Sequence, residues 1–167
     1  MKTRNSAKKR LMFIQKEDYN FLAYSTIILL YKLNCTSESN RFRDFRKIAY
    51  LVDFINEGGI PDDFSQKDLT NIYVKAQIKK KLMHHLVIIL KNKNYIKVSL
   101  NESSKTIDLW LNKEEVPTDF FDEVIFQKEM QNVNDLKSVM TAGIRSITIK
   151  KLVEKIFNKN NVLTWEV

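Results

Sequence analysis

The fold of this chain is decided by one stretch, residues 65–112: SQKDLTNIYVKAQIKKKLMHHLVIILKNKNYIKVSLNESSKTIDLWLN. Ser65 and Asp68 stand three residues apart ahead of an apolar run, the spacing at which a cap side chain satisfies the free amides of a first helical turn. We therefore expect a helix to begin at Gln66. Apolar residues with a helical period follow in two runs, which predict two short helices. The first run is Leu69, Ile72 and Tyr73, and the second is Ile78, Leu82, Leu86, Ile89 and Leu90.

The remainder of this stretch predicts a β-hairpin. Apolar and polar residues alternate from Tyr95 to Leu100 and again from Ile107 to Leu111, which is the period of a strand with one buried face. The polar residues 101–105 between these runs are expected to form the turn. Helix, turn, helix and hairpin is the order of a winged helix.

A further helix is expected ahead of this stretch. A helical apolar pattern covers residues 42–55, and the glycine pair at residues 58–59 ends it. A turn containing Pro61 then leads to Gln66. We predict a mostly helical α+β fold whose core, residues 42–113, is a winged helix (helix-turn-helix plus β-hairpin) flanked by N- and C-terminal helices.

The flanking segments are both expected to be helical. Residues 17–41 comprise a helix and a polar connector. Because this helix is apolar nearly all round, either it forms the centre of the domain or another subunit covers it. Residues 114–167 comprise a C-terminal helical segment that packs on the core or on a partner. In this segment we expect a helix from Phe120, an interruption at residues 132–134 and a last helix over residues 148–157.

Positive charge is concentrated in two regions of the chain. Residues 65–113 contain ten lysines and three acids, residues 1–16 contain six basic residues and no acid, and the remainder of the +8 chain is acidic. A local positive surface is typical of proteins that neutralise phosphates, although lysines that only keep a protein soluble give the same count. Residues 1–16 are expected to be a mobile basic tail, either an arm that binds nucleic acid or a partner, or an end without a role.

Several chemical functions are excluded by the composition. The chain has one cysteine, Cys35, which excludes an internal disulfide, and its longest apolar run is too short to cross a bilayer, so a cytoplasmic protein is expected. The three glycines form no phosphate-binding glycine motif. His84 and His85 are helix neighbours that point about 100° apart, and no second thiol is present for a zinc site. We expect a chain that is not an enzyme and that binds no cofactor, metal or small-molecule substrate.

Candidate nucleic-acid contacts lie on the second predicted helix and on the hairpin. The second helix of such a motif enters the major groove of duplex DNA, where Gln77 could contact a base edge while lysines contact phosphates. Val87 and Ile88 do not suit a hydrated groove, so the same helix suits a protein contact equally. The predicted nucleic-acid-binding residues are Gln77, Lys80, Lys81, His84, Lys97 and Lys105.

Candidate partner contacts come from three segments. Arginine side chains pair well with carboxylates or phosphates, and basic residues in the opening turns of a helix oppose its dipole; a solvated helix start is the alternative. A tryptophan two residues from the end either enters a partner or closes the core. The predicted partner-binding residues are Tyr24, Ile28, Tyr31, Arg43, Arg46 and Trp165.

A family resemblance rests on three features: the run RDFRKIAYLV at residues 43–52, the predicted winged helix after it, and the run TIKKLVEKIF at residues 148–157, closed by Thr164-Trp165. Together they resemble the small middle components of bacterial ABC-three-component defence systems, including the small subunit of Lamassu-type systems. The resemblance implies a non-catalytic accessory subunit that bridges an SMC-like ATPase and an effector of nuclease type in an antiviral or anti-plasmid complex, with double-stranded DNA as a further candidate partner. The alternative is a free winged-helix DNA-binding regulator of transcription or plasmid replication.

Overall fold

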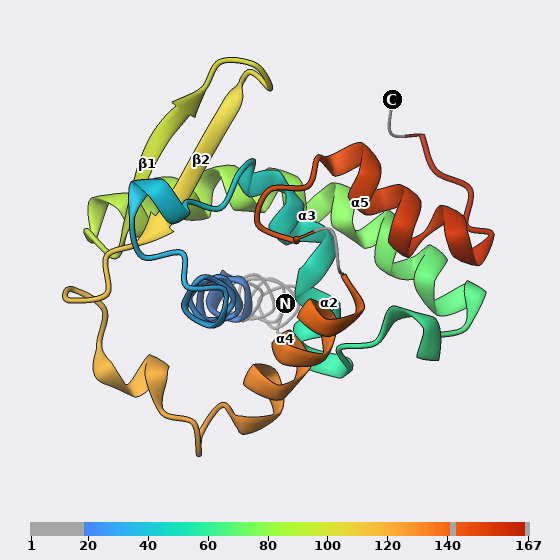
Figure 1. The fold of residues 1–167 in the computed structure, drawn as a ribbon, viewed down its shortest axis with the longest axis horizontal. Coiled ribbons are helices and arrows are strands. Elements are labelled where there is room, and N and C mark those ends of the chain that lie inside the picture. Colours follow the sequence, from blue (N-terminus) through green and yellow to red (C-terminus); the bar gives the residue numbers. More distant parts are fainter. Residues whose placement is uncertain (1–18, 141–142, 166–167) are drawn as a thin grey trace, which may run out of the picture.

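The computed structural model describes residues 19–140 and 143–165, and the predicted basic tail at residues 1–16 lies outside this part. The described chain contains five α-helices and one two-stranded antiparallel sheet, which confirms the mostly helical α+β class (Figure 1). Within the described residues, the first helix covers residues 19–32. The other elements are α2 (Ile48–Glu57), α3 (Gln66–Asn92), β1 (Ile96–Asn101), β2 (Thr106–Leu111), α4 (Gln127–Val139) and α5 (Ile149–Ile156). No helix in the described ranges is long and apolar enough to span a membrane.

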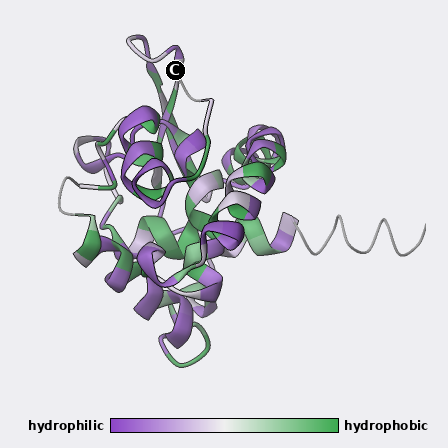
Figure 2. Ribbon diagram, turned by 90° about the vertical axis from the view of Figure 1, so that its right-hand side faces the viewer, coloured by the Kyte–Doolittle hydropathy of each residue, from purple (hydrophilic) through white to green (hydrophobic). Residues whose placement is uncertain are grey.

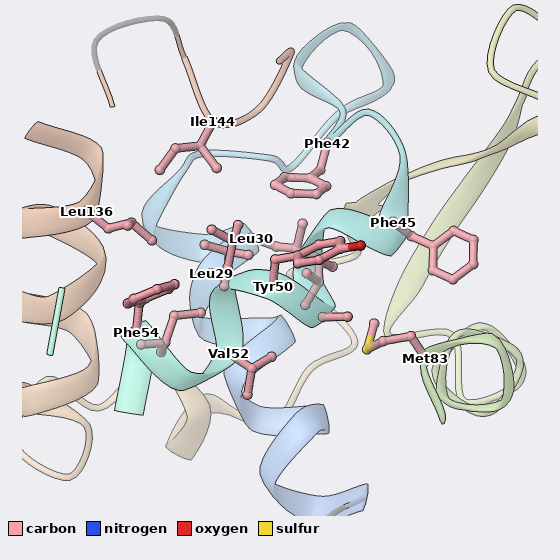
Figure 3. Close-up of a cluster of buried hydrophobic side chains, with 14 of the residues drawn as sticks. Leu29, Leu30, Phe42, Phe45, Tyr50, Val52, Phe54, Met83, Leu136 and Ile144 are labelled. Atoms are coloured by element: carbon pink, nitrogen blue, oxygen red, sulfur yellow. The ribbon is translucent and has the colours of Figure 1, made fainter. Parts of the chain in front are cut away.

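The helix over residues 19–32 lies at the centre of the molecule, where Figure 1 shows it nearly end-on with the other elements around it. Figure 3 shows Leu29 and Leu30 of this helix among side chains of α2, α4 and the segment before α5. Leu29 and Leu30 are fully buried, as is most of α2. The chain therefore covers its own apolar helix, in agreement with the first of the two expected explanations, because burying these side chains removes a large apolar area from water.

Helix α3 is one continuous helix of 27 residues, so the prediction of two short helices is wrong. It begins at Gln66 as predicted, and the Ser65 hydroxyl accepts a hydrogen bond from the Asp68 amide at 3.1 Å. Both apolar runs belong to this helix, and Ile78 and Ile89, which were assigned to its inner side, are exposed. The buried residues of α3 are Leu69, Ile72, Tyr73, Ala76, Met83, Leu86, Val87 and Leu90.

The hairpin forms as predicted, with Ile96 opposite Leu111 and Asn101 opposite Thr106. Phe42, which was expected to lie in a helix, instead pairs with Leu109 on the outer edge of β2 through two backbone hydrogen bonds of 2.8 and 3.0 Å. Because this pairing extends the chain, α2 begins only at Ile48, after a 3₁₀ turn at Phe45–Lys47.

The C-terminal segment differs from its prediction in α4 and agrees in α5. Phe120 lies in a 3₁₀ turn, and α4 begins at Gln127. The predicted interruption at residues 132–134 is wrong, because Asn132 is buried and donates a hydrogen bond to the Ile55 carbonyl at 2.8 Å, which joins α4 to α2. Helix α5 follows Thr148, whose hydroxyl accepts a hydrogen bond from the Lys151 amide at 3.3 Å.

Candidate nucleic-acid interface

The hairpin turn projects beyond the helices, at the top of Figure 1, and Figure 2 shows it as mainly hydrophilic ribbon. The strands next to this turn are held in place by Asp108 of β2, which is buried. The Asp108 carboxylate accepts hydrogen bonds of 2.9 Å from the Arg41 side chain, the Asp44 amide and the Asn101 side chain. Burial alone would raise the pKa of Asp108, but these hydrogen bonds and the charge of Arg41 hold the pKa below its ordinary value. The carboxylate is therefore charged and ties the hairpin to the chain before α2.

A second carboxylate, Asp44, holds the side chain of Arg46. The two guanidinium nitrogens Nε and Nη2 donate to Asp44 Oδ1 and Oδ2 at 2.8 and 2.7 Å, a bidentate pair. Asp44 has a φ of +60° and also accepts a hydrogen bond from the Arg46 amide. Arg46 was expected in the opening turn of a helix, where its charge would oppose the dipole. It lies instead in the 3₁₀ turn before α2, beside a compensating acid.

A polar cleft of about 400 Å³ opens between this turn, the hairpin turn and the start of α5. Three cations line it, and the side chain of Asp44 is the one acid among its lining residues. Arg43 and Lys150 are exposed, and neither has an ion-pair partner among the described residues. The residues lining the cleft are Arg43, Asp44, Arg46, Asn101, Ser103, Ser104, Ser146, Ile147, Thr148, Ile149 and Lys150.

A groove of about 540 Å³ adjoins this cleft, and Arg46 and Asn101 line both. Lys105 and Glu102 of the hairpin turn and His84 of α3 are among its lining residues, so the groove contains one acid. The His84 ring packs edge-on against Phe45 with 4.9 Å between ring centroids. We call the residues Arg43, Arg46, His84, Lys105 and Lys150 the basic strip.

The basic strip can bind an extended anion along its length. Three of its cations come from separate elements, so their charges lie apart along the surface instead of at one point. The Ser104, Ser146 and Thr148 hydroxyls of the cleft can donate hydrogen bonds, whereas the Ser103 hydroxyl donates to Asn101 Oδ1 at 2.8 Å. The start of α5 adds the positive end of a helix dipole. This combination of spaced cations and neutral donors is suited to a phosphate backbone.

The structure brings together two of the six predicted nucleic-acid-binding residues, His84 and Lys105. Gln77 does not point into solvent, since its amide donates to the Tyr73 carbonyl at 3.1 Å and to the Tyr50 hydroxyl at 3.4 Å. Lys80 lies over the Tyr50 ring at 5.3 Å. The remaining two predicted residues are exposed elsewhere: Lys81 on α3, and Lys97 opposite Trp110 near the base of the hairpin.

The predicted partner residues of the first helix are covered by the chain itself. Ile28 is fully buried. Tyr24 stacks on Phe126 at 5.6 Å and donates a hydrogen bond to Asn56 at 3.4 Å; burial, with the charge of Glu129, raises the pKa of Tyr24. Tyr31 packs on Phe121 at 4.6 Å.

Trp165 neither closes the core nor extends freely into solvent. Its ring packs edge-on against Tyr73 at 4.8 Å, and its amide donates to the Tyr73 hydroxyl at 3.1 Å. The indole is more than half exposed, at 59%. Partner binding by Trp165 stays a prediction.

Three residues that line the cleft were not predicted from the sequence: Ser103, Ser104 and Lys150. Thr148 was recognised as the start of a helix, but no pattern indicates that this start faces the hairpin turn, more than 40 residues earlier. Only the lysine pair at residues 150–151 marks the start of α5 as basic.

Cys35 is poorly suited to nucleophilic chemistry. Burial raises the pKa of its thiol to about 12, although Arg145 and Lys47 lower it, so the reactive thiolate is scarce at neutral pH. The thiol makes a long contact of 3.9 Å with the Leu33 carbonyl. Across residues 19–140 and 143–165, no group of three His, Cys, Asp or Glu side chains is placed to hold a metal ion.

Comparison of the chain with family models, curated proteins and solved structures finds no match.

Proposed function

We propose that this chain is a non-catalytic accessory subunit with a winged-helix core that contacts the phosphate backbone of double-stranded DNA through the basic strip. The observation that carries the proposal is the convergence of Arg43, Arg46, Lys105 and Lys150 around two adjoining clefts at the hairpin turn. The order α2, turn, α3 and hairpin supports the winged-helix core, in which α2 and α3 take the place of the two short helices expected within residues 65–90.

Backbone contact is favoured over the reading of base edges. Gln77, the amide expected to contact a base, is engaged by Tyr50 and Tyr73. The exposed side of α3 carries Ile78 and Ile88, whose side chains offer no hydrogen-bond donor or acceptor to a base edge. Contacts from the cations and hydroxyls at the hairpin turn to phosphates would orient the protein on a duplex without reading its base sequence.

The setting we propose is a defence complex, in which this chain bridges an SMC-like ATPase and a nuclease-type effector. The support for this setting is the resemblance of residues 43–52 and 148–157. These two runs supply Arg43 and Lys150, which both line the same cleft. Purifying the tagged protein from its native operon tests the setting. A stable assembly with a large ATPase is expected, whereas a lone monomer or homodimer would favour the free regulator.

Binding of a fluorescein-labelled DNA duplex to the full chain tests the basic strip. One ionic hydrogen bond contributes about 1.5 kcal/mol, or about tenfold in affinity, so Arg43→Ala and Lys150→Ala should each weaken binding by up to about tenfold. The matched control is Lys137→Ala, an exposed lysine on α4 outside the strip. Fluorescence anisotropy at fixed salt gives the affinities. Equal losses for Lys137→Ala and Lys150→Ala would contradict binding at the strip.

A further inference from the structure

The solvent-facing side of α3 carries a row of apolar side chains that no other described part of the chain covers. Their exposed fractions are 48% for Val74, 64% for Ile78, 60% for Ile88 and 44% for Ile89. At 100° per residue these four side chains lie on one side of α3 as two pairs, Val74 with Ile78 and Ile88 with Ile89. Lys81 and His85 lie on the same side between the two pairs. We call this surface the α3 face.

The α3 face continues into a groove of about 440 Å³ beside the first helix. Ile78 and Leu82 form one wall, and Phe21 and Leu22 contribute the other. The apolar surface is therefore wider than a single row, as a site for a second helix requires.

Beyond Asp68 the exposed charges of α3 are positive, and Asp53, which lines the adjoining groove, is paired with Lys79. After Asp68, α3 contains no acidic residue. Lysines accompany the apolar row, and the one at position 79 is neutralised by Asp53 at 2.6 Å. Of the exposed basic residues, Lys81 and His85 lie within the row between Ile78 and Ile88, Lys67 lies at its N-terminal end, and Lys75 lies beside it.

We propose that the α3 face binds an acidic amphipathic helix of a partner protein. Two apolar patches with basic side chains between and beside them complement a helix that presents apolar residues together with carboxylates. A second copy of this chain would bring lysines against lysines, and DNA would place phosphates against Ile78 and Ile88. Short branched aliphatic side chains, without an exposed aromatic ring among them, favour packing against a helix over insertion into a lipid surface. This binding does not depend on nucleic-acid contact at the basic strip.

Methyl NMR of the full chain with labelled isoleucines locates the binding. The probe is an 18-residue helical peptide with leucines on one side and glutamates beside them, and its twin carries lysine in place of every glutamate. The acidic peptide is expected to shift the methyl signals of Ile78, Ile88 and Ile89. Ile125, which is 62% exposed outside α3, is the internal control and should not shift. Equal shifts at Ile125, or no shift at the α3 face, would overturn the proposal.

Variants test the apolar and ionic contributions separately. Ile78→Glu with Ile89→Glu should weaken binding of the acidic peptide at least tenfold, whereas Val124→Glu, at another exposed apolar position, should not change it. Lys75→Glu with Lys81→Glu should reverse the preference so that the basic peptide binds more tightly. Equal binding of both peptides to the wild type would overturn the proposal. The proposal would also be overturned if the wild type dimerises, or binds anionic phosphatidylserine vesicles, and Ile78→Glu abolishes that dimerisation or binding.

Discussion

Replacing Lys47 by methionine is expected to remove a pH dependence from the stability of this protein. Lys47 is fully buried, and its Nζ donates to the carbonyls of Ile144 and Arg145 at 2.7 and 3.2 Å. The same nitrogen lies 4.4 Å from the centroid of the Phe42 ring. Burial lowers the pKa of Lys47 to about 7; the charge of Arg43 also lowers it, while Asp44, Cys35 and Asp108 raise it.

The sign and size of the effect follow from proton linkage. In the unfolded chain a lysine has a pKa of about 10.4, so between about pH 7 and pH 10 the unfolded state binds more protons than the native state. The free energy of unfolding therefore rises with pH through this window. As the pH falls toward 7, this added stability is lost. Integration from pH 7 to pH 9 gives about 2 kcal/mol. Cys35 acts in the opposite direction above about pH 8.5, because its pKa is raised in the native state, so the measurement stops at pH 9.

Urea unfolding at pH 7, 8 and 9 tests this reasoning. The free energy of unfolding of the wild type should rise by about 2 kcal/mol relative to that of Lys47→Met, which should lack this increase. The variant also leaves the Ile144 carbonyl without its Lys47 donor, at a cost of about 1 kcal/mol at every pH, which does not alter the slope. The control Lys137→Met should follow the wild type. Parallel pH profiles for the wild type and Lys47→Met would refute a native-state pKa near 7.

Two further stability predictions concern, first, the packing of the residues after α2 against α4 and, second, the hydrogen bonds of Asp108 in the hairpin. A Cβ at Gly59 would lie 2.1 Å from the Asn132 carbonyl oxygen, so Gly59→Ala should cost about 3 kcal/mol, whereas Gly58→Ala, whose Cβ meets the Phe64 ring at 3.7 Å, should change stability by under about 1 kcal/mol. Thermal unfolding compares the two, and equal losses would argue against close packing of α2 on α4. Asp108→Ala leaves the donors of Arg41, Asp44 and Asn101 without their acceptor and should cost about 3 kcal/mol in urea unfolding. A loss below about 1 kcal/mol would mean that Asp108 does not hold the hairpin in place.

Local chemistry was enough to predict the hairpin, the last helix and the start of α3. The strands alternate with period two, and Ser65 and Thr148 are cap residues whose side chains bind amides of the first turn. These features depend on neighbours within a few residues, and tertiary packing agrees with them.

Helix α3 was predicted as two helices because its apolar residues do not follow one stripe. Its first half is buried through residues such as Tyr73, and its second half through residues such as Met83. Ile78 and Ile89 are apolar but exposed, so they shift the apparent apolar side of the helix. An apolar pattern cannot distinguish a residue in the core from one on an uncovered surface.

The basic strip could be predicted only in part. Lys105 and His84 were assigned to a nucleic-acid surface and Arg43 to a partner surface, whereas the structure places all three in the lining of two adjoining clefts. Arg43 and Lys150 are more than 100 residues apart in sequence, and the packing that brings them to one cleft is tertiary. Asp44 forms a bidentate ion pair with Arg46 and not with Arg43. The spacing of these residues in the sequence does not show which arginine is paired.

The most direct test of phosphate contact by the basic strip is the salt dependence of duplex binding. The logarithm of the binding constant should fall linearly with the logarithm of salt concentration, with a slope of about −0.9 for each phosphate neutralised. Arg43→Ala with Lys150→Ala should reduce the steepness of this slope by about 2, while Lys137→Ala should leave it unchanged. A double variant that keeps the wild-type slope would contradict the proposal that these two side chains bind the phosphate backbone.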